Sequence, residues 1–216
     1  ADGYNECFER ISTGLVVKKF RSQTNLKTYQ WFQSQFPHAD GFKIPKEFTV
    51  YVGVKITPEE NQANSAIIVA RGSELSKIPD ILFGVAEYKA WTSDYAALFT
   101  WLDETLNEVC ERPMASTIWL HQDSEAYKPT IQQKLKQAVR IFREDNLAGI
   151  TEMNWYISEG KFYGLVEPEQ VTVAKDPFGL ISLRQETMTW NFNDKGEPSK
   201  VGSVLDCLRM VTYRFR

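Results

Sequence analysis

The sequence predicts an α/β fold built around a mixed β-sheet, and two observations lead to that prediction. Three apolar runs rich in β-branched and aromatic residues follow one another, separated by turn-forming segments. The apolar spacing then changes to the three- and four-residue period of amphipathic helices, which alternate with two further short runs of strand character. Strands and helices in such an order favour the α/β class.

The first half of the pattern predicts an antiparallel meander followed by a helix. Strands are expected at residues 48–56, 65–71 and 81–89. Between residues 93 and 110 the apolar residues recur on one helical face, and Pro113 follows shortly after this segment. The segment is therefore expected to be the first long helix.

The second half predicts a strand at 117–121, an amphipathic helix from Pro129 to about Asn146, and a strand at 152–158. The expected order is therefore β-β-β-α-β-α-β. Further along the chain, residues 181–192 alternate like a strand, and residues 201–211 have helical spacing.

The flanking regions are expected to be additions to this core. Within them, residues 13–20 suggest a strand and residues 25–36 a short helix. The expected organisation is an N-terminal extension at 1–47, a core at 48–160 and a C-terminal extension at 161–216, packed together as one domain.

Composition excludes several classes of protein. The chain has 216 residues, of which 43% are hydrophobic and 25% charged, values typical of globular domains rather than disordered chains. Its net charge of −3 argues against binding phosphate backbones over its whole surface, and leaves room for a local basic face.

The cysteines and the hydropathy of the sequence indicate the cellular compartment in which the chain is expected. The cysteines, Cys7, Cys110 and Cys207, form no CxxC pair and no zinc-ligand spacing, so we expect free thiols in a reducing compartment. The sequence has no apolar run of about 18 residues and no signal-peptide core near its N-terminus. We therefore expect no membrane partner and an intracellular location, cytoplasmic or nuclear.

Four segments add detail to the expected order of elements. They are SAIIVARG (65–72), SDYAALFTWLDETL (93–106), TIWLHQDSEAY (117–127) and residues 134–155. In order and spacing they resemble the second strand, first helix, fourth strand and following elements of the ribonuclease H-like superfamily. The likeness covers about residues 48–160, and it implies a ribonuclease H-like mixed sheet with N- and C-terminal extensions.

The resemblance also implies a site. Enzymes of this superfamily hydrolyse phosphodiesters with two divalent ions held by several carboxylates, the hard oxygen ligands that Mg²⁺ prefers. In this chain the helix carboxylate would be Asp94 and the fourth-strand carboxylate Asp123, which would act as the catalytic and metal-binding residues. The first strand, FTVYVGVKI, contains no acid.

The remaining carboxylate of such a site should follow the last strand. Glu167, Glu169 and Asp176 are available there, and none of them fits clearly. Asp40, in an Asp-Gly pair, would supply the first-strand acid in an alternative register, although such a pair is typical of a tight turn.

Two other groups of residues are candidates for function. His121 and Asp123 lie two apart on one strand face, where a base and an orienting carboxylate are conceivable. The expected second helix carries five basic residues, which could contact phosphates or could form an ordinary solvated face. These five are Lys128, Lys134, Lys136, Arg140 and Arg143.

These features favour a catalytically degenerate ribonuclease H-like domain that binds RNA or an RNA-containing duplex, or that acts as an assembly scaffold. Asp94 and Asp123 would then be remnants, and no cofactor is expected. The alternative is an active nuclease that uses Mg²⁺ or Mn²⁺ and takes its missing acid from a position such as Asp40 or Glu87. A third interpretation, which the mildly acidic charge suits, is a protein-binding module.

Overall fold

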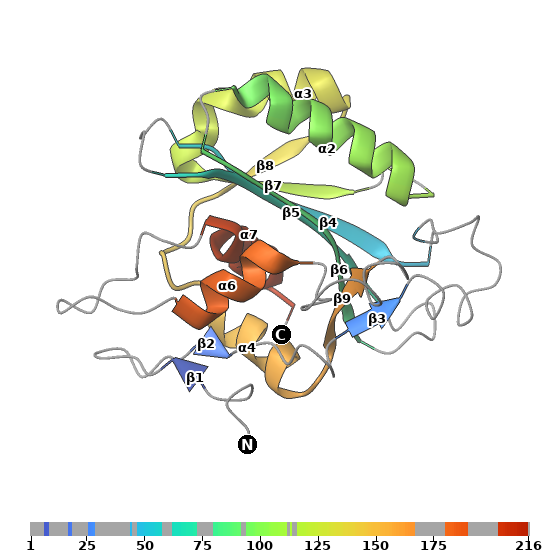
Figure 1. Cartoon of the computed structure of the whole chain (residues 1–216). Helices are drawn as coiled ribbons and strands as arrows, with labels where there is room; N and C mark the ends of the chain where they lie inside the picture. Colours follow the sequence, from blue (N-terminus) through green and yellow to red (C-terminus); the bar gives the residue numbers. More distant parts are fainter. Residues whose placement is uncertain are drawn as a thin grey trace.

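A mixed β-sheet forms the centre of the computed structural model (Figure 1). The structure describes residues 7–8, 17–18, 26–28, 44, 47–57, 62–72, 80–91, 94–111, 113, 116–166, 180–189 and 203–215. Within these residues the sheet has seven strands, in the order β3-β9-β6-β5-β4-β7-β8.

Five neighbouring strands, from β6 to the edge strand β8, lie within the core that the sequence predicts. They are β4 (Thr49–Lys55), β5 (Asn64–Arg71), β6 (Leu82–Ala90), β7 (Thr117–His121) and β8 (Val139–Phe142). Strands β4, β5 and β6 form an antiparallel meander, whereas β7 runs parallel to β4 and β8 parallel to β7. Helix α2 (Tyr95–Val109) precedes β7, and the 3₁₀ helix η4 (Gln122–Tyr127) and α3 (Lys128–Leu135) precede β8.

The order β-β-β-α-β-α-β is present, but its last strand is β8 (Val139–Phe142) and not the expected 152–158. The chain has a ribonuclease H-like α/β fold. The meander strands, the first long helix and the strand at 117–121 lie within a few residues of their expected positions. The helical spacing at 201–211 is confirmed by α7 (Ser203–Thr212).

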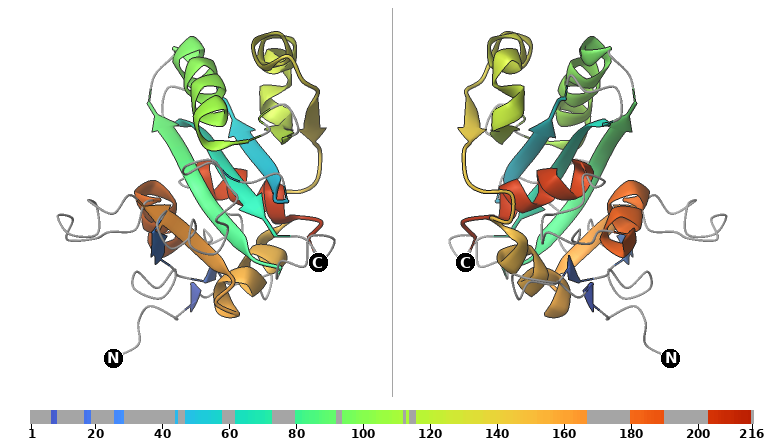
Figure 2. Two further views of the ribbon diagram at one scale, coloured as in Figure 1. Left: turned by 90° about the vertical axis from the view of Figure 1, so that its right-hand side faces the viewer. Right: turned by 90° about the vertical axis from the view of Figure 1, so that its left-hand side faces the viewer.

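Both faces of the sheet are covered (Figure 2). Alternate residues of a strand point to opposite faces. In β4, Val52 and Val54 pack in the cluster beneath α2 and α3, while Tyr51 packs in the cluster formed with α7. Helices α4 (Ile150–Ser158), α6 (Ile181–Thr189) and α7 lie on this second face. Burial on both faces explains why the central strands are almost continuously apolar.

The sheet extends beyond the expected core on the β6 side. β9 (Phe162–Val166) pairs in parallel with β6, and β3 (Leu26–Thr28) pairs in parallel with β9. β1 (Cys7–Phe8) and β2 (Val17–Lys18) form a separate two-stranded pair. The short helix expected at 25–36 is therefore wrong at Leu26–Thr28, and the rest of that segment lies outside the described residues.

The helix expected from Pro129 to Asn146 is wrong in its second half. Helix α3 ends at Leu135, and Lys136 turns the chain with a left-handed φ of 54°. Residues 139–142 then form β8, whose buried Val139 and Phe142 are three residues apart. That spacing also occurs on one face of a helix, so a four-residue strand could not be separated from the helix before it.

Two expected strands are helices in the structure. Residues 152–158 lie in α4, which buries Ile150, Met153, Tyr156 and Ile157 at helical spacing. The β-type composition of EMNWYIS favours a strand, but packing of this face against α7 determines that the segment is helical. The strand expected at 181–192 is α6 over Ile181–Thr189, and residues 190–192 lie outside the described residues.

None of the helices that the structure describes has the length and apolar character needed to cross a membrane. Cys110 and Cys207 are buried free thiols, as expected, and Cys7 belongs to the short strand β1.

Candidate functional site

Charged side chains from β4 and α7 meet near the carboxyl end of β4. The ammonium of Lys55 lies 2.6 Å from Oδ2 of Asp206, and the guanidinium of Arg209 lies 2.8 Å from Oδ1 of the same carboxylate. Lys55 is the last residue of β4, and Asp206 lies in the first turn of α7. The carboxylate of Asp206 is thus held between two cations.

Helix α7 reaches this position because two glycines allow it to approach closely. A Cβ atom on Gly53 of β4 would lie 2.4 Å from the carbonyl oxygen of Cys207. A Cβ atom on Gly149 would lie 1.8 Å from the carbonyl oxygen of Arg209, and Gly149 also has a left-handed φ of 92°. Only glycine meets both conditions without strain.

Arg209 is almost completely buried, with 1% of its surface exposed. Besides Asp206, its guanidinium donates to the carbonyl oxygens of Asp145 and Ala148, both at 3.2 Å. A buried charge requires such partners, because desolvation would otherwise be costly. Arg209 therefore fixes α7 to the loop before α4 and orients Asp206 at the same time.

The end of β7 lies beside this cluster. His121, the last residue of β7, is 4% exposed, and its Nδ1 accepts a hydrogen bond of 3.2 Å from the backbone N–H of Asp123. The hydroxyl of Ser124 accepts from the N–H of Ile56 at 2.7 Å and donates to its carbonyl at 2.6 Å. These bonds fix the start of η4 against the end of β4.

The electrostatics of the cluster favour an ionised Asp206 and a neutral His121. Burial by itself raises the pKa of Asp206, but the positive charges of Arg209 and Lys55 and their hydrogen bonds outweigh burial and lower it below its usual value. Burial, followed by the charge of Lys55, lowers the pKa of His121 to about 4. His121 is therefore uncharged near neutral pH, with Nδ1 acting as an acceptor.

The donor set does not fit the pair of divalent ions that the family resemblance implies. Such ions need several carboxylates converging on one point. Here Asp206 is already bound by an ammonium and a guanidinium, and a divalent cation beside them would meet like charge. Within the part of the chain that the structure describes, no three His, Cys, Asp or Glu side chains form a group able to hold a metal ion.

The two acids expected in the site have other roles in the structure. Asp94 is the N-cap of α2, where its Oδ1 accepts from the N–H of Ala97 at 3.2 Å. The side chain of Asp123 is 66% exposed, and its Oδ2 lies 3.5 Å from Nδ1 of His121. The expected pairing of His121 with Asp123 is thus present as a contact. Because the imidazole is uncharged near neutral pH, this contact is not an ion pair there.

The alternative sources of a missing acid were Asp40 and Glu87. The carboxylate of Glu87 accepts from the N–H groups of Ser182 and Leu183, at 2.7 and 2.9 Å, and so caps α6. Burial raises its pKa. Asp40 lies outside the described residues, as do Glu167, Glu169 and Asp176.

A second interior carboxylate, Glu186, has a similar role at the start of α7. It accepts from the N–H of Leu205 at 3.0 Å and forms an ion pair with Lys89 at the same distance. Anionic groups stabilise the N-terminal ends of helices. Glu186 therefore helps to hold the helix that carries Asp206.

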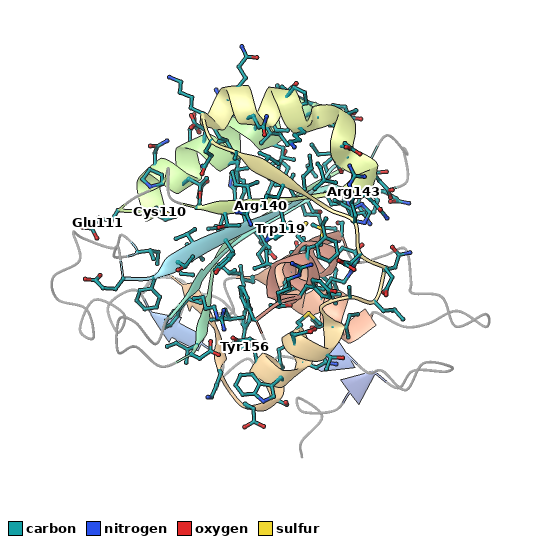
Figure 3. All side chains as sticks on the ribbon, turned by 180° about the vertical axis from the view of Figure 1, so that it is seen from behind. Cys110, Glu111, Trp119, Arg140, Arg143 and Tyr156 are labelled. Carbon is teal, nitrogen blue, oxygen red and sulfur yellow. The ribbon has the colours of Figure 1, made fainter. Side chains whose placement is uncertain are left out.

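The five basic residues expected on one helix are divided between two faces of the sheet. Lys128 and Lys134 belong to α3, and Lys136 is its C-cap. Arg140 belongs to β8 and lies over the ring of Trp119, on the α7 side of the sheet. Arg143 follows β8 and forms an exposed ion pair with Glu125 at 2.5 Å. Figure 3 shows Trp119 and Arg140 close together on the strands.

Sequence reasoning missed Lys55, Asp206 and Arg209. A signal for them is present in the printed sequence. Lys55 is the only charged residue in the strand TVYVGVK, and Asp206 and Arg209 are the only charged residues in the apolar helix SVLDCLRMVT. Charges inside apolar segments need partners, which is a reason to expect these residues to meet one another.

Comparison with known proteins identifies a fold and no family. No protein-family model matches the sequence, and no curated protein matches it either. Among solved structures, the chain is similar to the large terminase of the thermophilic bacteriophage D6E in complex with ADP, with 11% identity and a TM-score of 0.54. That match covers 78% of this chain and 40% of the terminase, so the chain spans less than half of that protein.

A second match is to the nuclease domain of the P22 large terminase. It has 14% identity and a TM-score of 0.46, and it covers 78% of this chain and 81% of that domain. The D6E match agrees with the strand order in placing this chain in the ribonuclease H-like fold. At 11% identity the likeness extends to the fold alone.

Proposed function

We propose that this chain is a catalytically inactive ribonuclease H-like domain that binds nucleic acid. The observation that carries the proposal is the carboxylate of Asp206 between Lys55 and Arg209. The family resemblance calls for a carboxylate on the first core strand, and the only charged side chain in β4 is a lysine. An ammonium in this place stabilises Asp206 without any metal, and among the described residues no group of three His, Cys, Asp or Glu side chains could hold the ions needed for hydrolysis.

The binding part of the proposal is supported by the superfamily resemblance and by exposed basic residues. Lys134 and Lys136 at the end of α3 are exposed, as is Arg140 on the other side of the sheet. Contacts of this kind to phosphates provide affinity that falls steeply as salt increases. RNA and RNA–DNA hybrids are the first ligands to examine, with duplex DNA for comparison.

The test measures cleavage and retention of labelled RNA–DNA hybrid, double-stranded RNA, single-stranded RNA and duplex DNA, with Mg²⁺ and with Mn²⁺. We expect no metal-dependent cleavage of any of them. We expect retardation of at least one ligand that weakens by about tenfold or more between low and moderate salt. The double variant Lys134→Gln/Lys136→Gln should weaken retention, since both side chains are exposed and can be changed without disturbing the core.

Asp123→Asn is the matched control for catalysis, because Asp123 is exposed and is the expected fourth-strand acid. Metal-dependent cleavage that disappears in this variant would show an active nuclease and contradict the proposal. Absence of both cleavage and salt-sensitive retention would contradict the binding role and leave a protein-binding module.

A further inference from the structure

A basic and aromatic pocket lies on the α7 side of the sheet, near the start of β4 and β7. Its volume is about 230 Å³, and the described residues that line it include three arginines, Arg71, Arg140 and Arg214, and no acidic residue. Aromatic rings form much of its wall: Tyr51, Trp119, Tyr213 and Phe215. Met210 and Val211, which are buried residues of α7, complete the apolar part.

The three arginines are not equally available to a ligand. Arg71 forms hydrogen bonds with the carboxylate of Asp80 at 3.1 and 3.4 Å and with the carbonyl of Phe215 at 3.0 Å, so its position is fixed and its charge is balanced. Arg214 lies 3.7 Å from Glu144, and its side chain is 75% exposed. The charge of this second pair is screened by water.

Arg140 differs from the other two. Within the described part of the chain it has no carboxylate partner, and it lies 5.9 Å from the ring centre of Trp119. Trp119 itself is held by edge contact with Phe142, at a ring-centre distance of 6.1 Å. The guanidinium is therefore positioned by an aromatic surface while its hydrogen-bond donors are left for a ligand.

This combination defines the chemistry of a ligand. Guanidinium groups bind phosphate through paired hydrogen bonds, and aromatic side chains stack on planar rings. The volume is below the about 300–1,000 Å³ of sites for drug-sized molecules, so a single phosphorylated ring suits it better than a duplex. We propose that the pocket binds one nucleotide unit, with its phosphate on Arg140 and Arg214 and its base or sugar against Trp119, Tyr51 and Tyr213.

The pocket is separate from the cluster around Asp206. Tyr51 and Lys55 both face α7 but are four residues apart in β4, which corresponds to about 13 Å at about 3.3 Å per residue. Helix α7 runs along β4 between them, with Asp206 at one end and Met210 and Val211 at the other. The pocket thus extends the proposed binding of nucleic acid to a defined subsite, and in that respect it rests on the proposed function.

The test uses the whole chain and calorimetric titration with 5′-AMP, adenosine, inorganic phosphate and phosphotyrosine. We expect 5′-AMP to bind more tightly than the other three. Arg140→Gln should weaken that binding about tenfold, and Arg140→Lys should restore part of it, since loss of a charge-assisted contact has an effect of this size. Glu108→Gln, which removes an exposed charge of α2 on the other side of the sheet, is the control and should have no effect.

Several outcomes would overturn the assignment. Failure of 5′-AMP to bind, or equal binding by wild type and Arg140→Gln, would show that the pocket is not a nucleotide site. Phosphate or phosphotyrosine binding as tightly as 5′-AMP would show that it does not select a nucleotide. Thermal melting of Arg140→Gln distinguishes loss of binding from loss of the fold, which we do not expect because Arg140 is exposed.

Titration with different ligands distinguishes two sources of the bound nucleotide, the end of an RNA strand and a free nucleotide. A short 5′-phosphorylated RNA that binds more tightly than its 5′-hydroxyl form and than 5′-AMP would indicate the end of a strand, and the reverse order would indicate a free nucleotide. Failure of this proposal is distinct from failure of the proposed function. Duplex retention without 5′-AMP binding would contradict only the pocket, and 5′-AMP binding without retention of any polymer would contradict only the polymer-binding role.

Discussion

At the scale of single residues, Lys55 determines the character of the cluster at the end of β4. Its ammonium neutralises Asp206 from one side while Arg209 neutralises it from the other. A carboxylate at position 55 would have the opposite effect, because two neighbouring carboxylates repel each other unless a cation lies between them. The residue type at position 55 therefore determines whether this place forms an internal ion pair or a candidate metal site.

We predict that Lys55→Asp makes the stability of the chain depend on a divalent cation. In the presence of a chelator, which removes divalent cations, the variant should unfold at a lower temperature than wild type. Mn²⁺ should restore stability by about 2.7 kcal/mol at about 100 times its dissociation constant. Thermal melting with and without Mn²⁺ measures both effects. Lys55→Met, which removes the charge without adding a ligand, is the control and should not respond to Mn²⁺; stabilisation of wild type by Mn²⁺ would contradict this interpretation.

His121 gives the chain a predictable response to acid. Burial and the charge of Lys55 lower its pKa from 6.5 to about 4 in the folded state. Between these values the unfolded chain binds a proton that the folded chain does not, so the free energy of unfolding falls as the pH decreases. A shift of this size corresponds to up to about 3 kcal/mol at about 1.4 kcal/mol per pKa unit.

Denaturant unfolding at pH 7 and pH 5 tests this expectation. Wild type should lose stability between these values, and His121→Asn should lose less, since the Asn amide oxygen can accept the Asp123 N–H without titrating. Asp206 does not interfere, because its pKa is below its usual value of 3.8 and its contribution is lost only at lower pH. An equal loss in wild type and in the variant would show that another group is responsible.

At the scale of elements, the docking of α7 on the sheet depends on two glycines rather than on hydrophobic burial alone. Gly53 and Gly149 leave space for the carbonyl groups of Cys207 and Arg209. Gly160 offers a comparison within the same chain, because it has a left-handed φ of 66° but no atom within 4 Å of an added Cβ.

We predict that Gly160→Ala lowers the free energy of unfolding by about 1 kcal/mol, the cost of the left-handed backbone alone. Gly149→Ala should lower it by about 3 kcal/mol or more, because steric overlap with Arg209 adds to the same backbone cost. Chemical denaturation of both variants measures the difference. Equal effects would mean that α7 can move away from Gly149 at little cost.

The elements that sequence reasoning predicted correctly share one property, which is a long and regular pattern. In the sequence the meander strands are separated by turn-forming residues, and α2 has 15 residues of helical spacing. The failures are short elements in which two patterns coincide. β8 has only four residues, and α4 contains β-type residues whose burial is decided by contact with α7. Local sequence patterns do not show contacts between distant segments. They therefore cannot decide between helix and strand for β8 and α4.

At the scale of the whole molecule, the same reasoning explains why the fold was predicted better than the site. The strand order follows from the sequence of elements and a few rules of connection. The cluster around Asp206 instead joins residues 151 positions apart, Lys55 and Asp206, and no local sequence pattern indicates where the helix that carries Asp206 packs. Asp94 and Asp123 match a family pattern that is visible in the sequence, whereas Asp206 is defined by its partners in the folded chain.

The position of α7 also has a consequence for the order of events during synthesis. Residues 203–212 cover one face of β4 and β5, with Cys207 against Gly53 and Ser203 against Ser65. The ribosome synthesises α7 about 130 residues after β5, at about 5–20 residues per second. The face of the sheet that α7 packs on is therefore exposed for several seconds. An apolar surface exposed for that time is a natural target for chaperones. Nascent chains that stop before residue 203 should be held by them, and longer chains should be released.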